Sequence, residues 1–138
     1  MMVNDRMPEY CVERAGKILN RFKKSLNGSR VLILGVAYKQ DIDDYRESPA
    51  LKVIDEFEKT GALVNFFDPY IPQYKERGVV REGEKELTKK LLESADIVVI
   101  TAAHTNVDYA FVQKYSKAIF DTKNVMKEVK MRENIEVL

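Results

Sequence analysis

An uninterrupted apolar run, followed by a polar loop and a helix start, is the feature that most constrains the fold. Residues 31–34 are all aliphatic and are followed by Gly35. Such a run is typical of a strand that is covered on both faces, as in a parallel sheet. Ser48 and Pro49 then match a helix N-cap and a first-turn proline. Ligands bind where a strand of a parallel sheet ends and a helix begins, so the intervening loop is a candidate site.

Short apolar runs alternate with helical patterns along the rest of the chain. Apolar spacing predicts helices over residues 8–26, 48–61, 84–94 and 108–115. Strands are predicted over residues 30–35, 62–67, 97–101 and 118–120, with a weak final strand at 135–138. The stretch 70–83 is polar and irregular, with a short extended piece at 79–80. Because strands and helices alternate, the predicted fold class is α/β, with a doubly wound, three-layer parallel sheet preceded by an N-terminal helix.

Composition and charge exclude several classes of protein. The 138 residues are enough for one domain with its own core. The formal net charge is +1, so nothing indicates a general binder of nucleic acid or of membrane surfaces. The single cysteine, Cys11, excludes an internal disulfide and gives no zinc-ligand cluster, which is typical of a reducing cytoplasm. No apolar run approaches the length of a membrane span, and no signal peptide is expected.

The loop after the first predicted strand carries cations among acidic residues. It contains one glycine, Gly35, where a dinucleotide-binding turn has three, so a backbone cradle for a pyrophosphate is not expected. Lys39 and Arg46 could supply the charge instead, since an ammonium and a guanidinium both bind phosphate oxygens. Lys123 follows the fourth predicted strand and belongs to the same sheet edge, where a joint anion site would form. The alternative is that Lys39 and Arg46 pair with neighbouring acids, Asp41, Asp43, Asp44 and Glu47, and that Lys123 is a surface lysine.

Other residues could carry chemistry, but each has a simpler structural interpretation. The acids at 41, 43 and 44 lack the glycine and the distant glutamate of a calcium loop, so no metal site is predicted. His104 could act as an acid or base, but a hydrogen-bonded loop histidine is the favoured interpretation. Cys11 could be a nucleophile, but it lies among apolar residues at helical spacing and is interpreted as a small buried hydrophobe. Tyr38 could stack on a base or pack beneath the loop. No catalytic residue is predicted.

Two motifs, G-V-A-Y-K at residues 35–39 and D-D-Y-R-E-S-P-A at residues 43–50, follow the first aliphatic run and resemble the C-terminal domain of the UDP-glucose/GDP-mannose dehydrogenase family. Residues 35–39 read G-V-A-Y-K, where that family has G-x-A-[FY]-K. Residues 43–50 read D-D-Y-R-E-S-P-A, where it has D-D-x-R-E-S-P-A. The further matches follow in order along the chain. They are D-P-Y at 68–70, the third strand at 95–101 with His104 after it, and D-T-K-N at 121–124, which is similar to D-x-R-N.

The resemblance covers about residues 28–126 and implies a division of the chain. Residues 1–28 would be a helix from the interdomain or dimerisation linker, and residues 29–138 a Rossmann-like nucleotide-sugar-binding domain. Residues 3–8 resemble the start of the family's interdomain helix, and their N-D-x-x-P reading leans toward members that act on UDP-linked N-acetylated amino sugars. The apolar face of residues 10–22 predicts a homo-oligomer formed through the N-terminal helix.

The resemblance also implies an activity and a set of contacts. Members of the family oxidise the C6 alcohol of a nucleotide sugar to a carboxylate with NAD, giving a UDP- or GDP-uronic acid. Tyr38 and Lys39 would contact the nucleotide sugar, most readily a UDP-sugar, and Arg46 would reach NAD bound by another domain. Lys123 takes the place of an arginine, so the charge at that contact is kept and the bidentate fork is lost.

Neither the NAD-binding motif nor the motif of the nucleophilic cysteine occurs in this sequence, so the chain alone is expected to be inactive. Two alternatives come from other classes of protein. The chain could be a free-standing Rossmann-like nucleotide-binding or regulatory module without oxidoreductase activity. It could also be a structural domain in which Lys39 and Arg46 form only local ion pairs.

Overall fold

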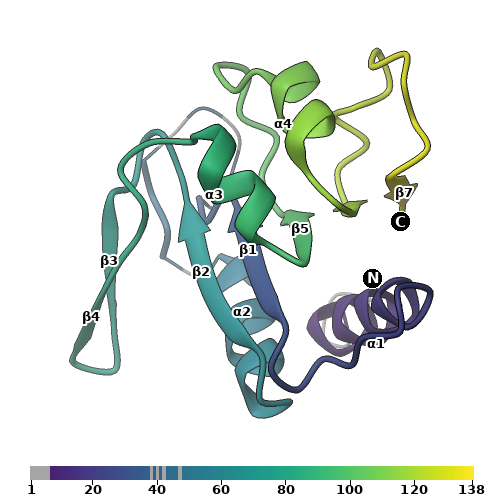
Figure 1. The fold of residues 1–138 in the computed structure, drawn as a ribbon. Coiled ribbons are helices and arrows are strands. Elements are labelled where there is room, and N and C mark those ends of the chain that lie inside the picture. Colours follow the sequence, from purple (N-terminus) through teal and green to yellow (C-terminus); the bar gives the residue numbers. More distant parts are fainter. Residues whose placement is uncertain (1–6, 38, 40, 42, 47) are drawn as a thin grey trace.

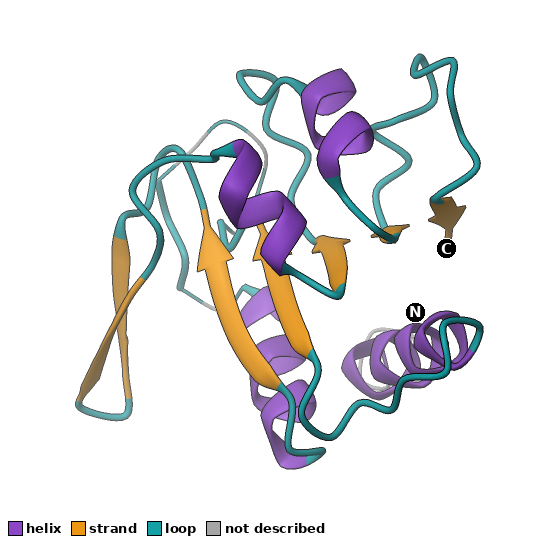
Figure 2. Ribbon diagram, in the orientation of Figure 1, coloured by secondary structure: helices purple, strands orange, loops and turns teal. Residues whose placement is uncertain are grey.

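A five-stranded parallel sheet forms the centre of the computed structural model, which describes residues 7–37, 39, 41, 43–46 and 48–138 (Figures 1 and 2). Its strands lie in the order β2-β1-β5-β6-β7, and every pairing between neighbours is parallel. The bounds are β1 (Arg30–Leu34), β2 (Leu63–Phe67), β5 (Ile97–Ile100), β6 (Ile119–Asp121) and β7 (Ile135–Val137). The predicted α/β class, the parallel sheet and the weak final strand are confirmed.

Helices cover both faces of this sheet. They are α1 (Met7–Asn20), α2 (Pro49–Lys59), α3 (Lys89–Ser94) and α4 (Tyr109–Tyr115). Successive side chains of a strand point to opposite faces, and β1 shows the division. Val31 and Ile33 belong to the core cluster of α1 and α2, whereas Leu32 and Leu34 belong to the core cluster of α3 and α4. The predicted three-layer arrangement is therefore confirmed, and it explains why β1 is apolar at every buried position.

The N-terminal helix is shorter than the prediction of residues 8–26, because α1 ends at Asn20. Lys23 adopts a φ of 62°, in the left-handed region. The N–H of Lys24 donates to the carbonyl of Leu19 at 3.1 Å, and the N–H of Lys23 donates to that of Asn20 at 3.0 Å. This pair of bonds is a Schellman motif, which usually has glycine at the left-handed position. The helical spacing of Phe22 misled the prediction, because that side chain is exposed.

The helix predicted over 84–94 is also shorter, because α3 begins only at Lys89. Thr88 caps it by accepting a hydrogen bond from the N–H of Leu91 at 3.1 Å. Glu84 lies outside the helix, and its N–H donates to the carbonyl of Phe66 at 2.8 Å. Glu84 thus forms a backbone hydrogen bond with β2, the outer strand of the sheet, and this bond competes with helix formation at residue 84.

The stretch predicted to be irregular contains a β-hairpin that projects from the sheet (Figure 1). Strands β3 (Gln73–Glu76) and β4 (Val79–Glu82) are antiparallel. Arg77 and Gly78 form the turn with φ values of 52° and 78°, as a type I′ turn requires. Arg81 binds Glu58 of α2 through two hydrogen bonds of 2.8 and 2.7 Å. The hairpin was missed because its residues are mostly polar and its turn begins with arginine instead of asparagine or aspartate.

The helix α1 is attached to the rest of the domain by packing and by charge. It packs against α2, and its buried side chains are Pro8, Cys11, Ala15, Ile18 and Leu19. Arg14 and Arg21 both pair with Glu136 of β7, at 2.8 and 2.7 Å. Most of the apolar face that predicted self-association is thus covered within the chain, while Tyr10 and Phe22 stay exposed. The domain boundary near residue 28 stays a prediction. None of the helices described is long and apolar enough to cross a membrane.

Candidate functional site

The carboxyl ends of β1 and β5 lie side by side at the point where the strand order reverses. In the strand order, β2, which follows β1 in the chain, lies next to β1 on the side away from β5. β6, which follows β5, lies next to β5 on the side away from β1. Ligands of open α/β sheets bind at this switch point. We name the segments that meet there by their strands: the β1 loop (35–48, described except for 38, 40, 42 and 47), the β2 loop (68–72), the β5 loop (101–108) and the β6 loop (122–128).

Gly35 allows the β1 and β5 loops to meet closely. Its φ is 96°, and a Cβ atom added to it would lie 2.6 Å from the Cβ of Ala102. Its N–H donates to the carbonyl of Phe67 at 2.9 Å, while the N–H of Thr101 donates to the carbonyl of Leu34 at 3.0 Å. The single glycine of this turn therefore brings strand ends together.

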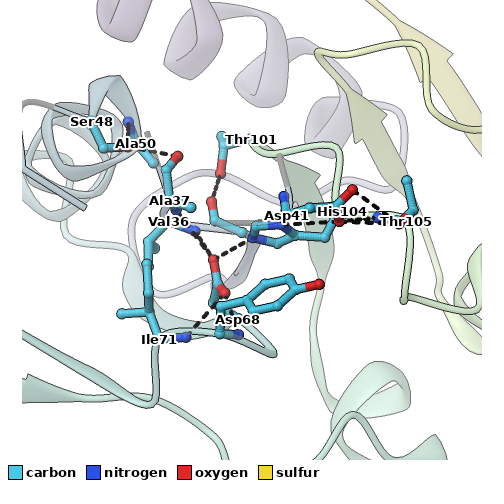
Figure 3. Close-up of polar contacts among 12 residues, drawn as sticks. Val36, Ala37, Asp41, Ser48, Ala50, Asp68, Ile71, Thr101, His104 and Thr105 are labelled. Atoms are coloured by element: carbon cyan, nitrogen blue, oxygen red, sulfur yellow. Dashed lines mark hydrogen bonds and ion pairs between the residues drawn. The ribbon is translucent and has the colours of Figure 1, made fainter. Parts of the chain in front are cut away.

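Asp68 is a buried carboxylate that organises the start of the β1 loop (Figure 3). Its Oδ2 accepts hydrogen bonds from the N–H groups of Val36 and Ala37 at 2.8 and 3.2 Å. Its Oδ1 accepts from the N–H groups of Tyr70 and Ile71 at 2.8 and 3.2 Å. The amides of Val36 and Ala37, which lie where a glycine-rich turn would offer amides to a pyrophosphate, are thus bound to the protein's own carboxylate. This gives a physical reason for the expectation that the turn forms no backbone cradle.

His104 links three of the loops. Its Nε2 lies 2.8 Å from Oδ2 of Asp68, and its Nδ1 accepts a hydrogen bond from the N–H of Asp41 at 2.7 Å (Figure 3). Since Nδ1 is an acceptor, the ring proton lies on Nε2, which donates to Asp68. The residue is 1% exposed, and its ring packs against that of Tyr70 at 4.9 Å between centroids. The interpretation as a hydrogen-bonded loop histidine is confirmed.

The two cations of the β1 loop are both exposed. Arg46 forms two hydrogen bonds with the carboxylate of Asp44, at 3.0 and 3.1 Å, so the predicted pairing with a neighbouring acid is confirmed for this residue. The hydrogen bonds from Arg46 lower the pKa of the Asp44 carboxyl. Lys39 lies between β1 and Asp41, with its side chain exposed. Tyr38, the other predicted contact of this loop, lies outside the described residues.

The β6 loop is folded around a second buried carboxylate, Asp121. Its Oδ1 accepts from the N–H groups of Lys123 and Val125 at 3.0 and 3.2 Å, and its Oδ2 accepts from that of Met126 at 2.9 Å. Asn124 adopts a φ of 54°, which completes the turn. The backbone of Lys123 is therefore fixed at the end of β6, while its side chain is exposed.

Cys11 of α1 is buried and is not built as a nucleophile. Burial raises the pKa of its thiol to about 11, although the charges of Lys123 and Arg14 act in the opposite direction. The side chain is 2% exposed and belongs to the core cluster of α1 and α2. The interpretation as a small buried hydrophobe is confirmed.

Lys39 and Lys123 thus lie on the same edge of the sheet. They follow β1 and β6, which flank β5, so the two strands are about 10 Å apart. Their convergence on one ligand stays a prediction, as does a contact between Arg46 and a cofactor. Among the described residues, no group of three or more acidic, histidine or cysteine side chains is placed to hold a metal ion.

Sequence reasoning missed the roles of Asp68 and Asp121. Asp68 directly follows β2, and Asp121 is the last residue of β6. Each carboxylate accepts hydrogen bonds from backbone N–H groups of the loop that follows it. The signal was present, because Asp68 precedes Pro69 and Asp121 precedes Thr122, as aspartates that start turns often do. What the pattern could not show is that Asp68 also binds the β1 loop and His104, which are distant in sequence.

Comparisons with known proteins agree with the resemblance. The family model described as "UDP-glucose/GDP-mannose dehydrogenase family, UDP binding domain" matches residues 32–128. A UDP-N-acetyl-D-mannosamine dehydrogenase of Methanocaldococcus jannaschii is 35% identical over 134 residues, which cover 90% of this chain and 28% of that protein.

Two solved structures show the same fold. The UDP-D-ManNAc dehydrogenase from Pyrococcus horikoshii has a TM-score of 0.77 at 27% identity, over 96% of this chain and 31% of that one. The NDP-N-acetyl-D-galactosaminuronic acid dehydrogenase from Methanosarcina mazei Go1 has a TM-score of 0.77 at 30% identity, over 97% and 29%. The chain therefore spans less than a third of the length of these relatives.

Proposed function

The chain belongs to the UDP-glucose/GDP-mannose dehydrogenase family, as its UDP binding domain, and on this premise we propose that it holds the nucleotide of a UDP-sugar at the carboxyl edge of its sheet. The observation that carries the proposal is the family match over residues 32–128, which includes both loops that present lysines at this edge. Lys39 and Lys123 would bind the diphosphate, and Tyr38 would contact the nucleotide sugar. Lys123 supplies a point charge, which attracts phosphate without the directional fork of an arginine.

We propose that the whole protein oxidises the C6 alcohol of a UDP-linked N-acetylated amino sugar to a carboxylate. Two relatives named for dehydrogenases of N-acetylated amino sugars support this choice of substrate class. Oxidation of an alcohol to a carboxylate removes two hydrides, and NAD would accept them. The chain's role is to position the sugar nucleotide, and positioning alone lowers a reaction barrier by several kcal/mol.

The residues of this chain do not fit a cradle for NAD itself. The amides of Val36 and Ala37, the second and third after β1, are bound by Asp68, and that of Gly35, the first, is bound by the carbonyl of Phe67. We therefore propose that NAD is held mainly by another part of the protein and that this chain contributes Arg46. Its guanidinium is exposed at the sheet edge and would exchange Asp44 for a phosphate oxygen.

Two further assignments stay proposals. Association of copies through α1 would use the exposed rings of Tyr10 and Phe22. A cytoplasmic location fits the single cysteine, Cys11, which is free and buried.

Calorimetry of the 138-residue chain with UDP, uridine and GDP tests the proposed function. UDP should bind, and uridine should bind at least about tenfold more weakly, because it lacks the diphosphate that the lysines attract. GDP should bind less tightly than UDP if the base is recognised. With NAD and UDP-sugars the chain alone should form no NADH. A chain that binds none of the three ligands would contradict the proposal and favour a structural domain.

A further inference from the structure

Among the described residues, His104 connects the β1, β2 and β5 loops through a single ring, and we propose that it is a positioning residue for nucleotide binding. Its ring would be held by the buried Asp68 and would in turn hold the backbone of Asp41 by a hydrogen bond. This bond would restrict the segment that carries Lys39. The proposal rests on the proposed function, because Lys39 is a ligand contact only there.

The ring has one orientation and one tautomer. Nε2 donates to Oδ2 of Asp68 at 2.8 Å, and Nδ1 accepts from the N–H of Asp41 at 2.7 Å. The backbone of His104 is held as well, because its carbonyl accepts a hydrogen bond from the hydroxyl of Tyr109 at 2.7 Å. Burial to 1% exposure and the contact with the ring of Tyr70 restrict any rotation. His104 can therefore present Nδ1 as a fixed acceptor to the β1 loop.

Asp41 is fastened to the β5 loop from two sides. Its N–H is bound by His104, and its carboxylate accepts from the N–H of Thr105 at 2.8 Å and from the Thr105 hydroxyl at 3.0 Å (Figure 3). Asp41 also adopts a φ of 61°, which residues other than glycine enter at an energetic cost. The Cα of Lys39 lies within about 7 Å of that of Asp41. Holding Asp41 thus limits where the Lys39 backbone can lie.

This arrangement predicts a specific dependence of affinity on one hydrogen bond. A lysine on a fixed backbone loses less conformational entropy on binding than a lysine on a loosely held one. The bond from Asp41 to Nδ1 should therefore affect affinity, whereas the bond from Nε2 to Asp68 should mainly affect stability. A histidine with a merely structural role would affect both together.

Two substitutions separate these bonds. In His104→Asn the amide oxygen can replace Nδ1 and accept from Asp41, but the side chain is too short to reach Asp68. In His104→Gln the amide nitrogen can replace Nε2 and donate to Asp68, while the N–H of Asp41 loses its acceptor. We expect H104Q to weaken UDP binding about tenfold and H104N to change it less than about threefold. Urea denaturation should show H104N to be less stable than H104Q, because H104N loses the bond to the buried Asp68. H104N should thus be the tighter UDP binder but the less stable variant.

Hydrogen exchange at the Asp41 amide gives an independent readout. The amide should be protected in the parent chain and in H104N, and unprotected in H104Q. UDP affinity that is unchanged in H104Q, or that falls in proportion to stability in both variants, would overturn the positioning role. If the parent chain binds no UDP, the proposed function itself is overturned. If the parent chain binds UDP and H104Q binds it equally well, only the positioning role of His104 is overturned.

Discussion

Replacing Asp68 with alanine is expected to lower the free energy of unfolding by about 5 kcal/mol, a large part of the stability of a domain of this size. The carboxylate is 4% exposed and accepts from four backbone N–H groups and from Nε2 of His104. Each buried donor left without an acceptor costs about 1–3 kcal/mol, and local rearrangement recovers part of the sum. Urea denaturation of the variant and of the parent chain measures the difference.

Two other aspartate substitutions make this experiment specific. Asp68→Asn keeps one acceptor oxygen and should cost about half as much as Asp68→Ala. Asp44→Ala removes an aspartate from the same edge whose side chain is 40% exposed and bonds with Arg46, and it should change stability far less than Asp68→Ala does. Equal effects of D68A and D44A would show that Asp68 does not organise the β1 loop.

Replacing Gly35 with alanine is expected to cost about 3 kcal/mol for two separate reasons. A φ of 96° is unfavourable for alanine by about 1 kcal/mol. The new Cβ would also lie 2.6 Å from the Cβ of Ala102 and 2.9 Å from its backbone nitrogen, and overpacking of this kind costs about 1–3 kcal/mol. The melting temperature should fall by about 10 °C, which differential scanning calorimetry would detect.

Gly28→Ala is the matched control for this variant. Gly28 also has a positive φ, of 84°, but nothing lies within 4 Å of the position of an added Cβ. It should therefore show only the backbone cost of about 1 kcal/mol. If G35A is no less stable than G28A, the close approach between the β1 and β5 loops is not a constraint on the fold.

Local patterns were sufficient to predict the main elements of the fold. Continuous apolar runs identified β1 and β5, because both strands are buried on both faces and need no polar alternation. The sequence of Ser48 and Pro49 identified the start of α2, where Ser48 caps the helix.

Errors arose where an unusual backbone conformation or residues distant in sequence shape the structure. The end of α1 depends on Lys23 in a left-handed conformation, and the sequence shows glycine only later, at residue 28. Arg81 of the hairpin binds Glu58 of α2, a partner 23 residues away in the sequence. Neither feature leaves a periodic trace in the sequence.

The candidate site was predicted in part. Lys39 and Lys123 were placed on one edge, because parallel strands end at the same side of a sheet, and β1 and β6 confirm that placement. The network that fixes the loops was not predicted. Asp68 and Asp41 lie 36 and 63 residues, respectively, from His104 along the chain, and only the strand order brings them into contact with it.

The central claim is that the two lysines bind one diphosphate, and UDP calorimetry on charge-neutral variants tests it most directly. Lys117 is the matched control, because it precedes β6 at the opposite end of the sheet and lies 4.0 Å from Asp96. We expect K39M and K123M each to weaken UDP binding about tenfold while uridine binding stays unchanged, and K117M to match the parent chain. UDP affinity that is the same in K39M, K123M and K117M would contradict the claim.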